Sequence, residues 1–417
     1  MEVKTERHKV VIVGAGPAGS TASIFLSKAG IPHLLIDKAT FPRDKICGDA
    51  LSGKVIPILR KMSPELPEML SVNSDQFIGS YGIRFSAPNG KYIDIPFDNS
   101  KDFKGKPPGF ISKRIDFDNF LFKRTSSSFC EIREQHSLKS VKRIDNELEL
   151  EIESSEGTYK IITSQLISSE GDRSITAKTL GGYKMEPAHY CAGIRTYYEG
   201  ITEMHEHNFI ELHFLKEMLP GYLWIFPLPN GMANVGAGML SSRIRNKKAD
   251  IKKQMQHAIA HNPKISHRFK NARIVDPVKG WGLPLGSKKR PISGSNYLLT
   301  GDAASLIDPF TGEGISNAMY CGMIGAEITM AAIAANDFSA KFLKEYDNKI
   351  YHRLWDELRL SKTMQDLSSV PWLFNFVVNR AQKNKTLQDT ISCMFDDLEL
   401  RSRLRNPAFY LKLLFNL

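Results

Sequence analysis

Cysteine is scarce in this chain, and its few cysteines are scattered. The 417 residues include five of them, Cys47, Cys130, Cys191, Cys321 and Cys393, and no two stand in a CxxC arrangement. The odd number and the wide spacing argue against a disulfide framework and against a thiolate zinc site. The sequence therefore predicts a reducing, cytoplasmic environment.

Long apolar runs are also missing. The apolar stretch near the N-terminus covers only a few residues before Gly14, which is too short for a secretory signal or a membrane span. No other window reaches the roughly 18 uncharged apolar residues that a span needs. We therefore expect a globular chain without a transmembrane segment. Its 417 residues, 42% of them apolar, suffice for two domains and an appendage.

Acidic residues are too few to balance the basic ones. The chain has 56 Lys and Arg against 45 Asp and Glu, which gives a formal net charge of +11, and basic runs occupy residues 243–253, 287–291 and 401–405. No nucleic-acid recognition module accompanies this charge, so we expect no nucleic-acid partner. Anionic lipid headgroups or a phosphorylated substrate account for the basic surface equally well.

Metal-ligand spacing is lacking as well. The segment MHEHNFIELHF (204–214) contains His205, His207, Glu211 and His213 at alternate or nearly alternate positions. This alternation predicts a strand or hairpin arm with the polar side chains facing water, and the His-x3-His helix spacing typical of zinc sites is absent. We therefore expect no metal site.

The first positive signal is the segment HKVVIVGAGPAGSTASIFLSKAGIPHLLIDK (8–38), whose pattern predicts strand, glycine turn, helix and strand. Gly14 permits the tight turn, Gly16 lets the backbone approach a pyrophosphate, and Gly19 lets helix and strand pack closely. Asp37, 23 residues after Gly14, is placed to accept hydrogen bonds from a ribose. The predicted dinucleotide contacts are Gly14, Ala15, Gly16, Pro17, Ala18, Gly19, Asp37 and Lys38.

A second segment decides which dinucleotide is expected. NYLLTGDAASLIDPFTGEGISNAMYCGMIGAEI (296–328) resembles the second flavin fingerprint of the FAD enzymes that include aromatic hydroxylases and geranylgeranyl reductases. The resemblance implies that FAD is the cofactor and that Asp302 hydrogen-bonds its ribityl chain. It also implies that a helix start faces the flavin pyrimidine, where its positive end would stabilise reduced flavin. The contacts implied are Gly301, Asp302, Gly312, Gly314 and Ile315.

Smaller matches lie between the two fingerprints. SKRIDFDNFLFKR (112–124) resembles the family's Arg-x-x-Phe-Asp helix start, which implies that Arg114 reaches the FAD phosphates. The same alignment implies that Leu138 lies beside the adenine through backbone contacts. LISSEGDRSITAK (166–178) departs from the family's Asp-Gly motif, because Glu170 replaces the aspartate and Ala177 stands where arginine is common.

Two further segments narrow the resemblance to the geranylgeranyl reductase group. KICGDALS (45–52) resembles that group's Lys-x-Cys-Gly-x-x-Leu-Ser segment, which implies that Cys47, Gly48 and Ala50 run past the isoalloxazine. PGYLWIFPLPNGMANVGAG (220–238) resembles its Tyr-x-Trp-x-Phe-Pro pattern followed by Asn-Val-Gly-x-Gly.

The alternation in the second of these segments places three rings, those of Tyr222, Trp224 and Phe226, on one face of a strand. They form either an ordinary core face or the wall of a long apolar cavity that suits a prenyl chain.

The resemblance implies an FAD-dependent reductase that saturates isolated C=C bonds of a polyprenyl group on a lipid, quinone or diphosphate. The candidate catalytic residues are Cys47, Tyr222 and Trp224, and the candidate substrate contacts are Tyr222, Trp224 and Phe226. No second glycine fingerprint is present, so the electron donor stays open between NAD(P)H and a redox protein. An NADPH- and O₂-dependent aromatic-ring monooxygenase and a non-catalytic prenyl-lipid carrier are the alternatives. A flavin-dependent halogenase is disfavoured, because Tyr222 and Phe226 depart from its Trp-x-Trp-x-Ile-Pro stretch.

The fold expected is α/β: an FAD-binding Rossmann-like domain of the glutathione reductase and aromatic hydroxylase type, interleaved with a β-sheet substrate domain. We assign residues 1–72, 106–182 and 272–345 to the first and residues 73–105 and 183–271 to the second. Residues 346–417 are expected to form a helical layer. Either that layer packs on the flavin domain, or residues 372–378 or the last turn rest on the inner face of the membrane.

Overall fold

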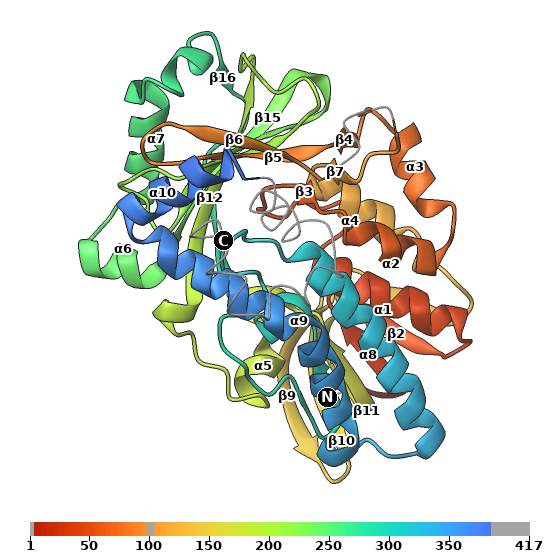
Figure 1. Ribbon diagram of the computed structural model, residues 1–417. Helices are drawn as coiled ribbons and strands as arrows, with labels where there is room; N and C mark the ends of the chain where they lie inside the picture. The colour runs from red at the N-terminus through yellow and green to blue at the C-terminus, as the bar shows by residue number, and fades with distance from the viewer. Residues whose placement is uncertain (1–3, 98–102, 104, 385–417) are drawn as a thin grey trace.

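The computed structural model describes residues 4–97, 103 and 105–384 of the chain. It contains two large sheets, one small sheet and surrounding helices (Figure 1). The strands are β1 Thr5–Val13, β2 His33–Ile36, β3 Ala50–Leu51, β4 Ile78–Ser80, β5 Gly82–Ser86, β6 Tyr92–Pro96, β7 Gly109–Ile111, β8 Cys130–Arg133, β9 Ser137–Ile144, β10 Glu147–Ser154, β11 Gly157–Ser168, β12 Tyr190–Glu199, β13 Ile210–His213, β14 Tyr222–Pro227, β15 Met232–Leu240, β16 Arg273–Ile274, β17 Lys279–Pro284, β18 Ser293–Gly294 and β19 Tyr297–Leu299. The α-helices are α1 Pro17–Lys28, α2 Val55–Met62, α3 Leu66–Val72, α4 Arg114–Phe122, α5 Ile175–Thr179, α6 Ser241–Lys247, α7 Ile251–His261, α8 Ile315–Ala335, α9 Ala340–Ser368 and α10 Pro371–Ala381.

The first large sheet is the Rossmann-like sheet that the sequence predicts. Its strand order is β18-β19-β11-β1-β2-β8, with β10 and β9 paired beside β11, and β19, β11, β1, β2 and β8 run parallel. The central strand β1 ends in the buried apolar run Val10–Val13, as expected when helices cover both faces of a parallel sheet. Helices α1 and α8 lie side by side against this domain (Figure 1).

Helix α8 is long and apolar enough to cross a membrane by length and composition. It contains Glu327, so it has no run of 18 uncharged residues. More than half (56%) of its most apolar window is buried inside the fold. A helix that packs against neighbours on several sides is apolar nearly all round, so its composition follows from its place between α1 and α9.

The second large sheet joins distant parts of the sequence. Its order is β16-β12-β15-β14-β13-β5-β6, with β17 also paired to β12, and all pairs except β13 with β5 are antiparallel. In Figure 1 the early strands β5 and β6 lie in the same layer as β15. This sheet is the interleaved substrate sheet expected in the fold class. The exact domain boundaries stay a prediction.

Strand β13 contradicts the expectation that the polar residues of 204–214 face water. Glu211 and His213 are buried, and the Glu211 carboxylate is bonded by Arg268 (2.6 and 2.9 Å) and by His213 Nε2 (3.0 Å). Burial opposes ionisation, but His213 and Arg268 lower the pKa of Glu211 to about 2. The strand lies inside the sheet, with β14 and β5 on either side, and both faces of the sheet are covered here, since all four of its residues are buried. No metal-binding cluster occurs among the described residues.

Helices α9 and α10 form the predicted helical layer and run from the flavin domain toward the substrate sheet (Figure 1). The Ser339 side chain accepts a hydrogen bond from Phe342 N (3.2 Å) at the start of α9, which crosses the predicted boundary at 346. Phe374 of α10 is buried, with its ring centroid 4.7 Å from that of Phe214. Residues 385–417, which contain Cys393 and the basic run 401–405, lie outside the described residues.

Candidate functional site

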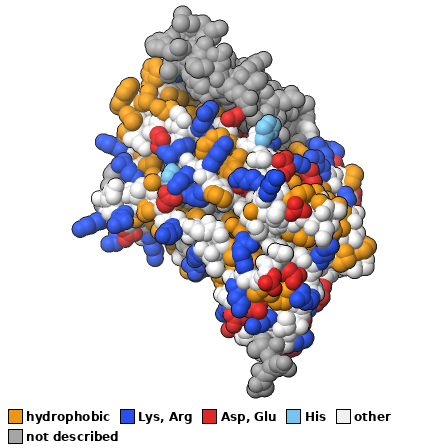
Figure 2. Space-filling model, turned by 90° about the horizontal axis from the view of Figure 1, so that it is seen from below, with side chains coloured by type: hydrophobic (Ala, Val, Ile, Leu, Met, Phe, Trp, Pro, Cys, Tyr) orange, Lys and Arg blue, Asp and Glu red, His pale blue; other side chains and the backbone are white. Residues whose placement is uncertain are grey.

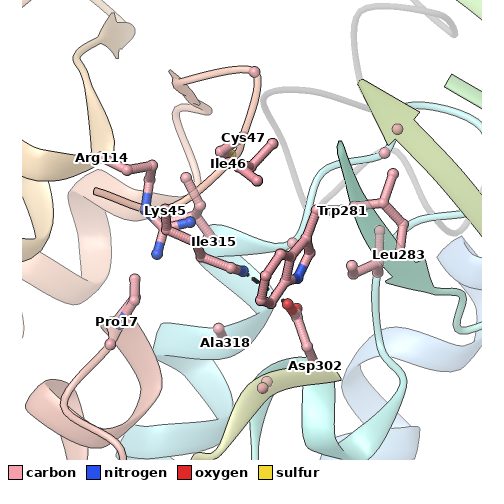
Figure 3. Close-up of a pocket in the computed structure, with 18 of the residues that line it drawn as sticks. Pro17, Lys45, Ile46, Cys47, Arg114, Trp281, Leu283, Asp302, Ile315 and Ala318 are labelled. Carbon is pink, nitrogen blue, oxygen red and sulfur yellow. Dashed lines mark hydrogen bonds and ion pairs between the residues drawn. The ribbon is translucent and has the colours of Figure 1, made fainter. Parts of the chain in front are cut away.

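A cavity of about 680 Å³ lies between the two large sheets and brings the predicted segments together. Figure 3 shows residues from the glycine turn, the loop at Lys45–Cys47, β17 and the start of α8 around it. The predicted residues that line it are Gly14, Gly16, Pro17, Ala18, Asp37, Lys38, Cys47, Gly48, Ala50, Arg114, Leu138, Tyr222, Trp224, Phe226, Gly301, Asp302, Gly312, Gly314 and Ile315. Ala15 and Gly19 are the two predicted contacts that do not line it.

The glycine turn between β1 and α1 has the shape that a dinucleotide pyrophosphate requires. A Cβ on Gly19 would lie 1.8 Å from the Gly14 carbonyl oxygen, so the helix can approach the turn only with glycine there. A Cβ on Gly16 would instead enter the cavity, with an Arg43 side-chain nitrogen 3.4 Å away as the nearest atom. The positive end of α1 faces the same space, because Pro17 and Ala18 line it.

Asp37 is held at the end of β2 by two backbone hydrogen bonds. Its Oδ2 accepts from Ala15 N (2.7 Å) and its Oδ1 from Ala39 N (2.8 Å). A carboxylate has about four acceptor sites, so these bonds fix the group and leave sites for ribose hydroxyls. The backbone N–H of Ala15 therefore orients the Asp37 carboxylate.

Asp302 has a partner that the sequence analysis does not include. Its Oδ2 lies 2.8 Å from Lys45 Nζ, drawn as the dashed line in Figure 3. This ion pair ties the carboxylate that is predicted to bind the ribityl chain to the Lys45–Cys47 loop. Lys45 begins the Lys-x-Cys-Gly motif, so the motif itself was the signal that could have identified it.

Arg114 begins α4, as predicted, and its guanidinium is buried. Nε and one terminal nitrogen donate to the two carboxylate oxygens of Asp118 at 2.7 and 2.8 Å. Burial opposes the charge, but Asp118 and the nearby Cys47 raise the pKa of Arg114. Arg43 bonds the same carboxylate at 2.5 Å. The contact of Arg114 with FAD phosphates stays a prediction.

The start of α8 opens on the cavity. Gly312, Gly314 and Ile315 line the cavity, and the first N–H groups of a helix have no partner within the helix. The Glu313 carboxylate accepts from Ser316 N (2.8 Å) and Ser316 Oγ (2.9 Å), and burial raises the pKa of Glu313.

Local contacts explain why residues 166–178 depart from the family's Asp-Gly motif. The Glu170 carboxylate accepts from the backbone N–H groups of Ile175 (2.8 Å) and Thr176 (3.2 Å), so it caps α5. Glu170 also lines the cavity, whereas Ala177 is buried in the core of the flavin domain.

The three rings of β14 form one wall of the cavity, as the alternation predicts. The Tyr222 hydroxyl donates to the Thr311 carbonyl beside the start of α8, and Trp224 Nε1 donates to Asn234 Oδ1 (2.8 Å). Gly236 stands opposite Trp224 in β15, where a Cβ would lie 2.2 Å from the indole ring. Trp224 and Phe226 also belong to an apolar core, so the wall is both core face and cavity lining.

Asp49 and Asn234 are site residues that sequence reasoning missed. Asp49 is fully buried beside the cavity, and its Oδ2 accepts from Asn234 Nδ2 and from the Tyr197 hydroxyl, both at 2.8 Å. Burial raises the pKa of Asp49 to about 6, against the lowering effect of these hydrogen bonds and of Arg195 and Arg114. Asp49 and Asn234 lie inside the two motifs of the geranylgeranyl reductase group, whereas no sequence signal marks Tyr197.

Comparison with known proteins agrees with this geometry. The model of the FAD binding domain family matches residues 7–349. Digeranylgeranylglycerophospholipid reductase of Methanocaldococcus jannaschii is 31% identical over 369 residues, 87% of this chain and 88% of that protein. The enzyme of the same name from Methanococcus vannielii is 29% identical over 88% of this chain and 89% of its own. Menaquinone reductase of Mycobacterium tuberculosis is 31% identical over 76% of each chain.

Solved structures share the fold. A geranylgeranyl bacteriochlorophyll reductase-like protein of Thermoplasma acidophilum superposes with a TM-score of 0.81 at 23% identity, covering 96% of this chain and 99% of that one. The flavin-dependent brominase Bmp2 superposes with a TM-score of 0.76 at 18% identity, covering 97% and 99% of the two chains. From the family match, the relatives and the paired fingerprints around one cavity, this chain belongs to the geranylgeranyl reductase family of FAD-dependent oxidoreductases.

Proposed function

We propose that the protein is a reductase that saturates isolated C=C bonds of a polyprenyl group, such as geranylgeranyl, carried by a lipid, a quinone or a diphosphate. The observation that carries this proposal is the single cavity in which the flavin-binding turn, the Cys47 loop and the rings of β14 meet. The relatives named digeranylgeranylglycerophospholipid reductase and menaquinone reductase support it.

The substrate side of the cavity is apolar. Beyond the β14 rings its lining includes Ile210, Leu212, Leu283 and Phe310. Such a wall offers a prenyl chain contact along its length and offers few hydrogen-bonding groups to a polar phenol. This favours prenyl reduction over the aromatic-ring hydroxylation that the flavin fingerprints alone allow.

FAD, when bound and reduced, supplies a hydride equivalent. An isolated alkene is unpolarised, so a proton must reach one carbon as the hydride reaches the other. The π bond then becomes two C–H bonds, and the alkene gains two electrons. The faces of Tyr222 and Trp224 are placed to stabilise positive charge that develops at the tertiary carbon, by about 1–2 kcal/mol in a dry site.

Cys47 is the proposed proton donor. Its side chain is half-buried, it lies in the loop that lines the cavity, and Figure 3 shows it on the same side of the cavity as Arg114.

The reductant that returns FAD to its reduced form is either NAD(P)H or a redox protein.

The test is anaerobic single turnover. Photoreduced holoprotein is mixed with a geranylgeranyl phospholipid, and flavin reoxidation is followed by absorbance. The molecular mass of the lipid product is then measured by mass spectrometry. We expect reoxidation without O₂ and a gain of two hydrogens for each reduced bond. Absence of reoxidation would favour the lipid carrier, and a requirement for O₂ would favour the monooxygenase.

We also propose a cytoplasmic location with contact at the inner face of the membrane. On α10, Trp372 is 70% exposed and Phe376 is 41% exposed, and Arg380 lies 5.9 Å from the Phe376 ring. Tyr92 of β6, 50% exposed, lies near the C-terminal end of α10, where Gln382 donates to its carbonyl. Exposed aromatic rings beside cationic groups fit an anionic lipid surface. We call Trp372, Phe376 and Tyr92 the α10 face.

A further inference from the structure

Three separate segments meet at Asp49. The residue lies in the loop of residues 41–53, between Cys47 of the cavity lining and the short strand β3, with a left-handed φ of 71°. Its side chain is fully buried and bonded to Tyr197 of β12 and Asn234 of β15. The carboxylate therefore joins the flavin-side loop to two strands of the substrate sheet.

Asn234 extends the connection to the aromatic wall. Its Oδ1 accepts from Trp224 Nε1 (2.8 Å), and its Nδ2 donates to both the Cys47 carbonyl (2.7 Å) and Asp49 Oδ2 (2.8 Å). One fully buried amide thus fixes the indole ring relative to the Cys47 backbone. The strand register places Asn234 opposite Phe226 on one side and Tyr197 on the other.

A buried arginine ties the same loop to the same strand a second time. Arg195 of β12 is fully buried and donates to Asp44 (2.6 Å) and Asp276 (2.5 Å). Its guanidinium carbon lies 4.0 Å from the centroid of the Tyr197 ring. Tyr197 is therefore held from its face as well as through its hydroxyl, which makes it a rigid support for Asp49.

We infer that Asp49 is a positioning residue which, through Asn234, holds the Trp224 ring and the Cys47 backbone at a fixed separation and so determines which double bond of the bound chain is reduced. The inference rests on the proposed function. Its physical basis is that reacting groups must be placed within a fraction of an ångström, and a 1 Å misplacement costs up to about 10²-fold in rate. The Tyr197 hydroxyl, the Asn234 amide and Trp224 Nε1 all have hydrogen-bond partners, and a buried network whose members are bonded in this way is rigid.

The test compares deletion with conservative replacement. Asp49→Gly removes the carboxylate and suits the left-handed backbone, whereas Asp49→Asn keeps an oxygen that can accept from Asn234 and Tyr197. We expect Asp49→Gly and Asn234→Ala to lower kcat by about 10- to 100-fold and to broaden the number of bonds reduced, with FAD content retained. Asp49→Asn should stay within about threefold of the wild type.

A second pair of variants, with smaller changes, tests the inference if Asp49→Gly or Asn234→Ala does not fold. Tyr197→Phe removes one hydroxyl that bonds Asp49, and Tyr198→Phe makes the same change at the next residue, whose ring packs in a different apolar cluster. We expect Tyr197→Phe alone to change the product pattern. It should also change the alkylation rate at Cys47, measured by peptide mass spectrometry with Cys130 as the internal reference.

Two results would overturn the inference. One is a wild-type rate and product pattern in Asp49→Gly and Asn234→Ala, together with identical behaviour of Tyr197→Phe and Tyr198→Phe. The other is loss of FAD in parallel with loss of activity, which would assign the network to cofactor retention. If instead the wild-type protein reduces no prenyl lipid, the proposed function fails, while Cys47 alkylation still tests the network.

Discussion

Cys47 shows how much a single residue's meaning depends on its neighbours. In a packed core a thiol is an inert small apolar group. Here the side chain is half-buried, the residue lines the cavity, and its carbonyl is held by Asn234 Nδ2 at 2.7 Å. The backbone is thereby fixed while the side chain remains accessible, which is the arrangement that a proton donor requires.

The first residue-scale prediction concerns proton delivery. Cys47→Ser should retain FAD but slow anaerobic reoxidation of the reduced protein by a prenyl lipid by about 10²-fold, because a weaker acid replaces the thiol. Stopped-flow absorbance measures this rate. Cys130→Ser, a change at another half-buried cysteine, should leave it unaltered. A normal rate in Cys47→Ser would show that the proton comes from elsewhere.

The second residue-scale prediction concerns pH. Because burial raises the pKa of Asp49 to about 6, the folded protein holds a proton between about pH 4 and pH 6 that the unfolded chain has already released. This residue's stabilising contribution is thus present at the acidic end and is lost as pH rises through about 6. The groups facing the carboxyl are Asn234, Tyr197, Arg195 and Arg114.

The comparison is with Asp49→Asn, which does not titrate. The free energy of unfolding of this variant minus that of the wild type should rise by up to ~3 kcal/mol between pH 4 and pH 7. Urea denaturation at several pH values measures the difference, in which groups unaffected by the mutation cancel. A difference that does not vary with pH would mean that Asp49 titrates normally.

At the scale of elements, the glycine turn and the start of α8 form two halves of one predicted flavin cradle. Gly16→Val should lower FAD retention, because a side chain there enters the space at the positive end of α1. Asp302→Ala should do so by about tenfold, through loss of a charged acceptor. Equilibrium dialysis of FAD measures both.

Asp366→Ala is the matched control for the change at Asp302. Asp366 is a largely exposed carboxylate of α9 that pairs with Lys362 on the helix surface, so its loss should leave FAD affinity unchanged. A colourless wild-type protein that binds NAD instead would refute the assignment of the cradle to FAD.

Several helices and strands occur where the sequence pattern predicts them. β1, α1 and β2 occur where the glycine turn and the apolar periodicity predict them, and Arg114 begins α4 as its motif implies. Alternation placed the three β14 rings on one face. Pattern reading failed at β13, because alternation indicates which residues share a face and does not indicate whether that face meets water.

At the scale of the whole molecule, the charge of +11 and the α10 face point to the same partner. Figure 2 shows Lys and Arg spread over the visible face with Asp and Glu among them, so the basic excess is not confined to one binding groove. A dispersed positive charge favours approach to an anionic surface, and exposed rings then anchor the contact.

Vesicle sedimentation tests this contact. The protein should bind vesicles containing anionic phospholipid more tightly than zwitterionic ones. Trp372→Ala should weaken binding by about tenfold, as expected when one aromatic side chain no longer inserts into the lipid. Ile274→Ala removes an exposed apolar side chain from β16 and should have no effect. Equal binding by both variants would remove the α10 face from the contact.

The sequence by itself determined the cofactor class, the family and 19 of the 59 residues that line the cavity. These depend on short-range features: glycines at a tight turn, a helix start, an acidic residue at a strand end, and a period of two in a strand. Such features are determined by neighbouring residues, so they can be recognised without knowing the rest of the fold.

Tertiary structure decided the partners of those residues. Lys45 pairs with Asp302 across 257 positions, Asn234 reaches Cys47 across 187, and Tyr197 reaches Asp49 across 148. The first contact depends on the strand order that places β2 and β19 in one sheet, and the other two depend on how the substrate sheet meets the loop after β2. No local pattern encodes either arrangement. The buried carboxyl of Asp49 acquires its raised pKa for the same reason, since it is the surrounding sheets that exclude water from it.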